Sequence, residues 1–228
     1  MKTSNKFLVA ILVLAIISMV SFDMALRAEY KKGDYKSPHY GDVLIPVEDF
    51  DVIEDYTSYK TFTDITSGSK FEIWVDKSAQ NDLIFTVKNH ILKINFKKSN
   101  SDDRNQAYGI HIRCPRLNEL TRAISPGDKV IYESGSLTMG IFNQDSVRLE
   151  NSAPGIINLT PVDVKKIKMI MWDGLLNIGG NGNADTADFD IRNGSRLDIG
   201  KIKMRKVNYK LDDSSQVTLS GAVWHQIR

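Results

Sequence analysis

Apolar residues recur about every twenty residues through the C-terminal half of the chain, and short turns of small polar residues separate them. The apolar positions align in three columns: Leu137, Leu176, Leu197 and Val217; Met139, Ile178, Ile199 and Leu219; and Ile131, Ile170, Ile191 and Leu211. A single repeat of this length cannot bury its own apolar face, whereas stacked repeats align the columns into one core. The repeat therefore predicts a β-solenoid over residues 117–228.

The corners of this repeat are rich in glycine, asparagine and serine, as in Asn193-Gly194-Ser195 and Asp213-Ser214-Ser215. Solenoids accept such corners, and they also accept insertions there, such as Gly179-Gly180-Asn181-Gly182-Asn183. About five rungs fit, and at roughly 4.8 Å per rung they would form a stack about 25 Å long. Because no amphipathic helical period interrupts the pattern, we expect an all-β fold.

Residues 49–116 show the two-residue alternation of half-buried strands, clearest in Phe71–Asp76. The apolar runs 83–87 and 91–96 flank Lys88-Asn89-His90, an arrangement that predicts a hairpin. We therefore expect an N-terminal β portion made of antiparallel strands.

The N-terminus carries an apolar run, Phe7–Phe22, that contains no charge. It is longer than a typical signal-peptide core, and Met24–Leu26 brings it to the length of a membrane span. We predict an uncleaved signal anchor over residues 1–26, with a cleaved signal peptide and a buried core helix as alternatives. No cysteine lies near the end of the run, which argues against a lipid-anchored protein.

Residues 27–48 are predicted to form a tether, since they are polar, contain turn formers and show no helical or strand period. The order of lysine, apolar run and polar segment favours a cytoplasmic N-terminus and an exported domain. The positive charges on the two sides of the run are nearly balanced, because basic residues also follow it: Arg27, Lys31, Lys32 and Lys36.

The composition argues against a nucleic-acid partner. The 228 residues are 42% hydrophobic and 25% charged, with a formal net charge of +2. Nucleic-acid-binding domains usually show a basic excess or stripe, which this chain lacks. The single cysteine, Cys114, excludes an intramolecular disulfide. It lies on the same side of an alternating strand as Ile110 and Ile112, which predicts a buried, inert thiol.

No set of residues predicts a metal site, a cofactor or a catalytic residue. The histidines have no partner at metal-binding spacing: His39, His90, His111 and His225. Gly179–Asp185 resembles a calcium-binding nonapeptide, but its aspartate falls one place late and the copy is single. We interpret these glycines as a corner. Nucleophile-elbow, GxGxxG and P-loop motifs are absent from the sequence.

Acidic residues on successive rungs leave an enzymatic alternative open. Glycosidases need two carboxyl groups about 5 to 10 Å apart, and some rung acids could align. These acids are Asp185, Asp188, Asp190, Asp198, Asp212 and Asp213, with a basic group nearby at Lys201, Lys203, Arg205 and Lys206. Solvated surface residues give the same pattern, so we favour a surface role.

Trp74 and Trp172 are the candidate ligand-binding residues. Trp74 lies on the polar side of its strand, and Trp172 takes the place of Asn193 in a later rung, which predicts a corner. An exposed indole can stack on a sugar ring or anchor a protein partner. Packing under a loop is the commoner role of a large aromatic residue, and for Trp224, in the last rung, we expect packing or capping.

The order of these segments resembles that of a known family. A hydrophobic N-terminus is followed by the segments Phe50–Ile53, Phe71–Val75, Leu92–Ile94 and Ile110–Leu117, and then by rungs that end in small-residue turns. Over residues 50–227 this order is similar to the head GIN domain proteins, described as putative auto-transporter adhesins of Gram-negative bacteria. The resemblance implies a right-handed, single-stranded parallel β-helix with an N-terminal β portion and an envelope location. It supplies no functional residues.

Together these features favour a non-catalytic cell-envelope module that presents a β-helix face to a protein or polysaccharide. The module would be anchored in the inner membrane with its domain in the periplasm, or exported. A polysaccharide lyase or hydrolase is one alternative. A signalling scaffold is another, and it would need a membrane partner because few residues precede the apolar run.

Overall fold

The computed structural model describes residues 3–33, 36–97, 107–125, 135–140, 142–160, 163–221 and 223. The chain divides into two compact units, residues 1–41 and 42–228. The described part is mostly β, with one N-terminal apolar helix and two mixed sheets.

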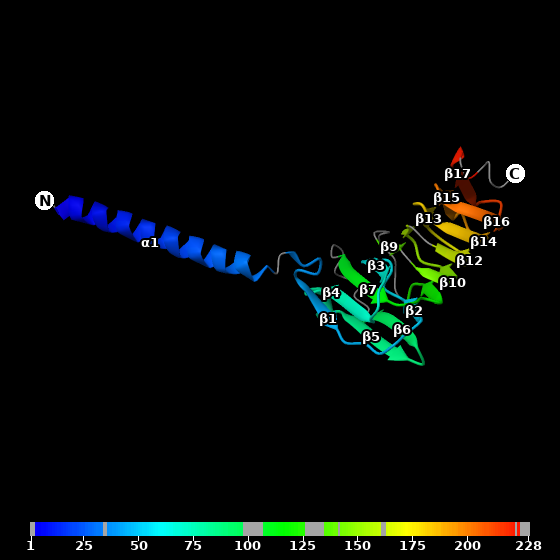
Figure 1. Ribbon diagram of the computed structural model, residues 1–228, viewed down its shortest axis with the longest axis horizontal. Helices are drawn as coiled ribbons and strands as arrows, with labels where there is room; N and C mark the ends of the chain where they lie inside the picture. The colour runs from blue at the N-terminus through cyan, green and yellow to red at the C-terminus, as the bar shows by residue number, and fades with distance from the viewer. Residues whose placement is uncertain are drawn as a thin grey trace. The chain divides into compact units, whose positions relative to one another are not determined.

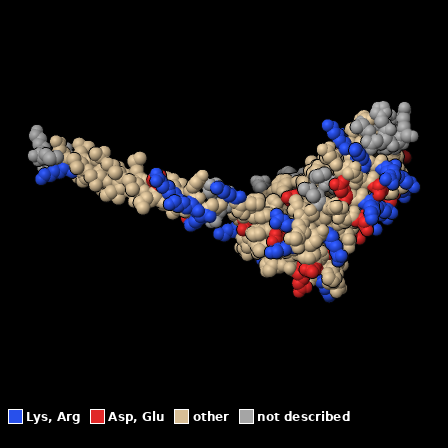
Figure 2. All heavy atoms as spheres, viewed as in Figure 1, with Lys and Arg blue, Asp and Glu red and all other residues tan. Residues whose placement is uncertain are grey.

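The first unit is dominated by helix α1, Thr3–Lys32. The helix ends where Gly33 adopts a φ of 75°, a conformation that glycine accepts readily, and Lys31 and Lys32 lie at its negative dipole end. It continues beyond residue 26, where we expected the anchor to end. Within the described residues it is the helix long and apolar enough to cross a membrane, and its apolar window is unburied (Figure 2). The alternative of a buried core helix is therefore wrong.

The second unit contains two sheets whose strands alternate along much of the chain (Figure 1). The first sheet has the order β1 (Asp42–Ile45), β4 (Glu72–Asp76), β7 (Tyr108–Cys114), β3 (Thr61–Ser67), β9 (Ser136–Gly140), β11 (Ile156–Leu159), β13 (Leu175–Ile178), β15 (Arg196–Ile199) and β17 (Gln216–Leu219). The second has the order β16 (Lys203–Leu211), β14 (Asn183–Ile191), β12 (Asp163–Met171), β10 (Asn143–Asn151), β8 (Glu119–Arg122), β2 (Val52–Asp55), β6 (Ile91–Phe96) and β5 (Leu83–Lys88). A short 3-10 helix, η2 (Ala79–Asn81), precedes β5.

Strands β8 to β17 alternate between the two sheets, and from β10 onward each pairs in parallel with the strand two places earlier. Two of the predicted columns are confirmed by this register. Leu137, Ile157, Leu176, Leu197 and Val217 are successive partners, and Met139, Leu159, Ile178, Ile199 and Leu219 form the second column. The sequence alignment omitted Ile157 and Leu159.

The third column was wrong at Ile170. Ile191 pairs with Met171, and Ile170 is an outward-facing partner of Asp190. The error arises because the turn that follows β14 is one residue longer than the turn that follows β12. Counting back equally from the aligned residues Leu176 and Leu197 therefore matches Ile191 with Ile170 instead of Met171. Met171 is buried, as an inward position requires, whereas Ile170 is half-buried. Ile131 lies outside the described residues.

The N-terminal β portion is mixed rather than antiparallel. The β5–β6, β1–β4 and β4–β7 pairs are antiparallel, but β2 pairs in parallel with β6 and β8, and β3 pairs in parallel with β7 and β9. The reason is that the chain crosses from one sheet to the other between β2 and β3, so later strands return in the same direction. The predicted hairpin is confirmed, with Asn89 and His90 both at positive φ as in a tight hairpin turn.

One core runs through both sheets and both halves of the second unit. It includes Ile53, Ile73, Ile112, Leu137 and Ile191, all at most 1% exposed. The residues predicted as an N-terminal portion, 49–116, therefore share their sheets and their core with residues 117–228.

Glycines stack at one corner between the sheets, where successive turns of the chain come into close contact. The backbone N–H of Ile156 donates to the carbonyl of Gly135, and that of Leu175 donates to the carbonyl of Gly155. A Cβ added at Gly135 would overlap the carbonyl oxygen of Ser58, and one at Gly155 would overlap that of Gly135. The corner therefore requires residues without side chains.

We expect Gly135→Ala to destabilise the fold by about 2 kcal/mol or more, because the obstructing atoms belong to the backbone and cannot rotate away. Gly221→Ala is the control, since a Cβ there has no heavy atom within 4 Å. Urea unfolding of the detergent-solubilised full chain, followed by circular dichroism, measures the difference. Equal midpoints for the two variants would contradict the packing argument.

Candidate functional site

Trp172 lies at the corner directly after β12, and its backbone N–H donates to the Asn151 carbonyl at 2.8 Å. Its side chain is 37% exposed. The guanidinium of Arg192, one turn of the chain later, lies 4.3 Å from the centre of the indole ring. This distance is typical of a cation–π contact. The predicted corner position is thus confirmed. The residue aligned with Trp172 is Arg192 rather than Asn193, because the turn after β14 is one residue longer than the turn after β12.

Asp190 holds Arg192 in place through both carboxylate oxygens, with Nε and Nη2 as the donors. The same bonding, with Arg192 as the main cause, holds the pKa of the Asp190 carboxyl below its usual range. One face of the indole is therefore covered by a fixed cation, while part of the ring meets solvent. Such a corner offers a flat apolar surface beside a planar donor group, which suits a sugar ring or a protein side chain.

Trp74 lies elsewhere, on β4 in the first sheet. Its strand has Ile73 and Val75 buried, so the predicted outward orientation of Trp74 is confirmed. Its partners in register are Leu44 on β1 and His111 on β7, and its side chain is half-buried. Among the described residues no ring contact joins the two tryptophans: Trp74 is on a strand of the first sheet, and Trp172 is in the turn after a strand of the second. Trp224 lies outside the described residues.

The acidic residues of the last rungs are engaged one by one rather than in pairs. Asp185 faces Arg205 at 3.5 Å, Asp188 faces Lys166 at 3.4 Å, and Asp198 faces Arg196 at 2.9 Å. Of the basic group noted in the sequence, Arg205 thus contributes an ion pair to a neighbouring acid.

Asp212 caps the turn that follows β16. It accepts hydrogen bonds from the Ser215 hydroxyl at 2.6 Å and from the Asn193 backbone N–H at 2.5 Å, and these bonds depress the pKa of its carboxyl strongly. The pKa of Asp188 is also lowered, mainly by the Asn208 amide at 2.7 Å. A glycosidase needs one carboxyl whose pKa is raised so that it can donate a proton. Asp188 and Asp212 are therefore unsuited to the role of the acid that donates this proton.

A shallow concavity of about 300 Å³ lies over β12, β14 and β16 of the second sheet. Alternating charges line it: Lys168, Asp188, Asp190 and Lys210, with Asn208 and Tyr209. Figure 2 shows positive and negative side chains interspersed over this part of the molecule.

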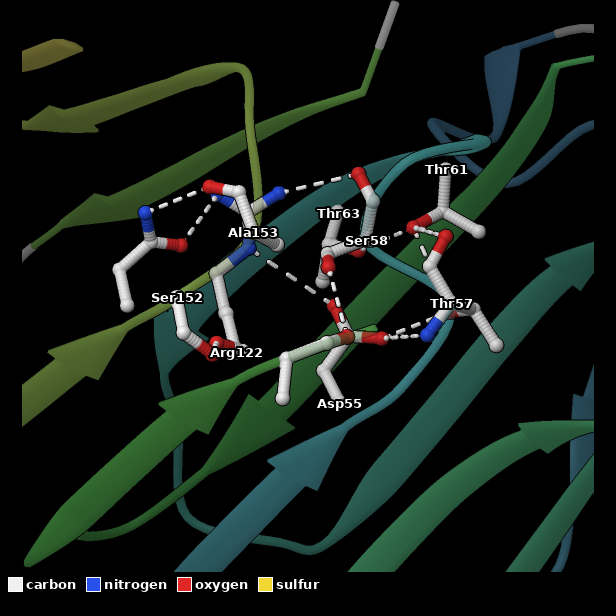
Figure 3. A network of polar contacts seen from close by, with 10 residues as sticks. Asp55, Thr57, Ser58, Thr61, Thr63, Arg122, Ser152 and Ala153 are labelled. Carbon is white, nitrogen blue, oxygen red and sulfur yellow. Dashed lines mark hydrogen bonds and ion pairs between the residues drawn. The ribbon is translucent and has the colours of Figure 1, made fainter. Parts of the chain in front are cut away.

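A buried polar network, missed in the sequence, joins the two halves of the second unit (Figure 3). Arg122 is fully buried, and its Nη2 donates to the Ser58 carbonyl at 3.1 Å, while Nε lies 3.9 Å from Oδ2 of Asp55. Oδ1 of Asp55 accepts bonds from the backbone N–H and the hydroxyl of Thr57, at 2.8 and 2.7 Å. Asn151 extends the network, since its Oδ1 lies 3.5 Å from Nη1 of Arg122.

This network is structural rather than catalytic, because Asp55 and Arg122 are at most 1% exposed. Burial raises the pKa of Asp55 and lowers that of Arg122, since loss of solvent outweighs their mutual attraction. A signal was present in the sequence: Arg122 is two residues after Leu120, and Asp55 is two after Ile53, so both occupy inward positions of alternating strands.

We expect Arg122→Met to destabilise the fold by roughly 3 to 5 kcal/mol, because it leaves a buried carboxylate without its cation. Adding Asp55→Asn should recover about 1 kcal/mol or more, since the neutral amide still accepts from Thr57. Unfolding free energies of the two single variants and the double variant measure this coupling. Additive losses would show that the pair does not interact.

The remaining predictions for this region concern metals and Cys114. Among the described residues no group of three His, Cys, Asp or Glu side chains could hold a metal ion. In the loop that resembled a calcium motif, Gly180 has a φ of 86°, and Asp185 faces Arg205. Cys114 is buried as predicted, and burial raises the pKa of its thiol to about 12.

Comparisons with known proteins place the chain in a family. No curated protein matches it. Among solved structures, a putative adhesin from Bacteroides fragilis is 14% identical, with a TM-score of 0.46 over 78% of this chain and 96% of that one. A putative adhesin from Parabacteroides distasonis is 13% identical, with a TM-score of 0.43 over 78% and 96%. A putative lipid binding protein from the same organism is 15% identical, with a TM-score of 0.37 over 79% and 94%. A family model matches residues 49–222, so the chain belongs to the family described as putative auto-transporter adhesin, head GIN domain.

Proposed function

We propose that this chain is a non-catalytic envelope module that binds a protein or polysaccharide through the outer faces of its β domain. The observation that carries the proposal is the state of the outward-facing acids on the last rungs. Asp188 and Asp190 are each paired with a neighbouring cation, and Asp212 is hydrogen-bonded within its turn, so these acids are engaged in surface contacts one by one. Membership in an adhesin-like family agrees with this role.

We further propose that the second unit winds as a right-handed parallel β-helix that presents these faces. Support comes from the alternation of successive strands between two sheets and from their parallel register. The stacked glycines at one corner support the same winding, since they let the chain pass closely over its previous turn.

The proposed location is the cell envelope, with α1 as an uncleaved anchor in the inner membrane and the β domain on the periplasmic side. The support is the exposed apolar surface of α1, which needs a membrane around it if it is retained. Its cytoplasmic end would carry Lys6.

We expect protease added to spheroplasts of a Gram-negative host to remove a C-terminal epitope, while intact cells protect it. The physical reason is that the outer membrane, and not the inner one, would separate the domain from the protease. An epitope protected in spheroplasts as well would place the domain in the cytoplasm and contradict the proposed orientation. The same gel reports whether α1 is cleaved, from the mass of the mature chain.

Within this function we propose Trp172, together with Arg192, as a ligand contact. The indole is partly exposed on a corner whose backbone is fixed, and Arg192 is held in place by Asp190. A rigid aromatic residue beside a fixed guanidinium loses little entropy when a ligand binds. Trp74 is the second candidate, since it is half-buried on the outer face of the first sheet.

We expect the full chain in detergent to bind members of an array of envelope polysaccharides and envelope proteins without forming product. Trp172→Ala should weaken binding roughly tenfold or more, as for an interface anchor. Trp74→Ala is the matched control that removes an indole from the other sheet. Loss of binding with Trp74→Ala alone would move the contact to the first sheet. Mass spectrometry of the polysaccharides decides the enzymatic alternative, because cleaved products would overturn the non-catalytic proposal.

A further inference from the structure

Two inward-facing columns of the second sheet are buried on the earlier strands but exposed on the last one, β16, whereas Met204 on the same strand stays buried. Phe189 is 2% exposed, while its partner Tyr209 on β16 is 44% exposed. Ile191 is 0% exposed, while its partner Leu211 is 44% exposed. Apolar core positions therefore reach solvent at this end of the sheet.

The backbone of β16 is also open along one side. In the part of the chain that the structure describes, β16 pairs with β14 and with no strand beyond it. A strand at the edge of a sheet presents unpaired N–H and carbonyl groups that can take up a further extended chain. On β16 the exposed side chains of Tyr209 and Leu211 add apolar packing contacts, which backbone hydrogen bonds alone do not give an added strand.

The charges of the outward side chains of β16 determine which extended chains can pair with its free edge. Four of them are basic and exposed: Lys203, Arg205, Lys206 and Lys210. Ion pairs between neighbouring strands join outward charges of opposite sign, Asp145 with Lys165 at 2.7 Å and Asp185 with Arg205 at 3.5 Å. A further strand beside β16 would need acidic side chains to form such pairs with these four basic ones.

Three of the four cations still lack an ion pair. Among the described residues, no carboxylate lies within 4 Å of the amino groups of Lys203, Lys206 or Lys210. Basic residues on an edge also keep it from pairing with neutral or basic strands. The edge thus rejects most chains and selects an acidic one.

A second copy of this chain does not satisfy the edge. Pairing β16 with β16 would oppose lysines to lysines. The other free edge of the second sheet is β5, whose outward side chains are Ile84, Thr86 and Lys88, and these carry no acid. Because neither pairing through the second sheet supplies acids, we take the occupant to be a segment of a different protein.

We propose that the free edge of β16 accepts an extended segment of a partner protein in which acidic and apolar side chains alternate. The segment adds a strand to the second sheet by backbone hydrogen bonds. Its acidic side chains face Lys203, Arg205, Lys206 and Lys210, and its apolar side chains cover Tyr209 and Leu211. This site is distinct from the Trp172 corner, so the two proposals stand or fall separately.

The test uses fluorescent nine-residue peptides and the full chain in detergent, with binding followed by anisotropy. A peptide alternating glutamate and valine is expected to bind roughly tenfold or more tightly than one alternating lysine and valine, with affinity that falls as salt rises. Methylating alternate backbone nitrogens of the glutamate peptide, on the side that pairs, should abolish binding, because strand addition requires those N–H groups.

The triple variant Lys203→Glu, Lys206→Glu and Lys210→Glu leaves Arg205 as the one outward cation of β16, already paired with Asp185, and should reverse the preference, so that the lysine peptide binds and the glutamate peptide does not. Lys88→Glu on the opposite edge of the sheet is the matched control and should change neither affinity. Thermal unfolding of each variant verifies that the fold is retained, and Tyr209→Ala should weaken the glutamate peptide without changing its salt dependence. Absence of peptide binding, binding indifferent to the charge reversal, binding that survives backbone methylation, or self-association through β16 would each overturn the proposal.

Discussion

The guanidinium of Arg122 is the contact on which the arrangement of the second unit depends. A buried charge costs several kcal/mol unless its neighbours compensate it. Here the compensation comes from three separate places: Asp55 on β2, the Ser58 carbonyl in the turn before β3, and Asn151 at the end of β10. These groups meet only if β2, β8 and β10 lie side by side in one register. The network thus ties the first crossing between the sheets to the start of the repeat.

Beyond Asn151 the same inward column becomes apolar, with Met171 and Ile191 as its next members. This change separates two parts of the second unit in which the pairing of neighbouring strands is determined differently. In residues 49–125 buried hydrogen-bonding groups select the strand partners, because each must find one particular acceptor or donor. From β12 onward repeated apolar residues and backbone ladders suffice, and each turn of the chain copies the last. Slippage in the repeated part is limited by the corners, where Gly135 and Gly155 admit no side chain.

This division explains what could be predicted from sequence. The columns through Leu137 and Met139 were predicted, because their spacing depends only on local periodicity. Ile170 was misplaced by one residue, because a turn of different length looks the same as a turn of equal length until the strands are paired. The parallel pairing of β2 with β8 joins segments more than sixty residues apart along the chain, and no periodic signal reports it. Trp172 was identified as a corner residue, whereas its partner Arg192 required the correct register.

The charges on the outer faces follow from the same stacking that forms the core. In a parallel sheet each outward residue has a neighbour on the strand on either side, and some opposite charges meet there, as Lys165 meets Asp145 at 2.7 Å and Lys166 meets Asp188 at 3.4 Å. Among the described strands none pairs with β16 on its other side, and the outward charges of β16 are mostly basic. Two of the apolar columns end exposed at the same strand, at Tyr209 and Leu211. A terminal strand made only to cap the stack would carry polar residues at these inward positions, since a cap must face water. β16 instead carries Tyr209 and Leu211 at these positions, which supports the proposed addition of a partner strand.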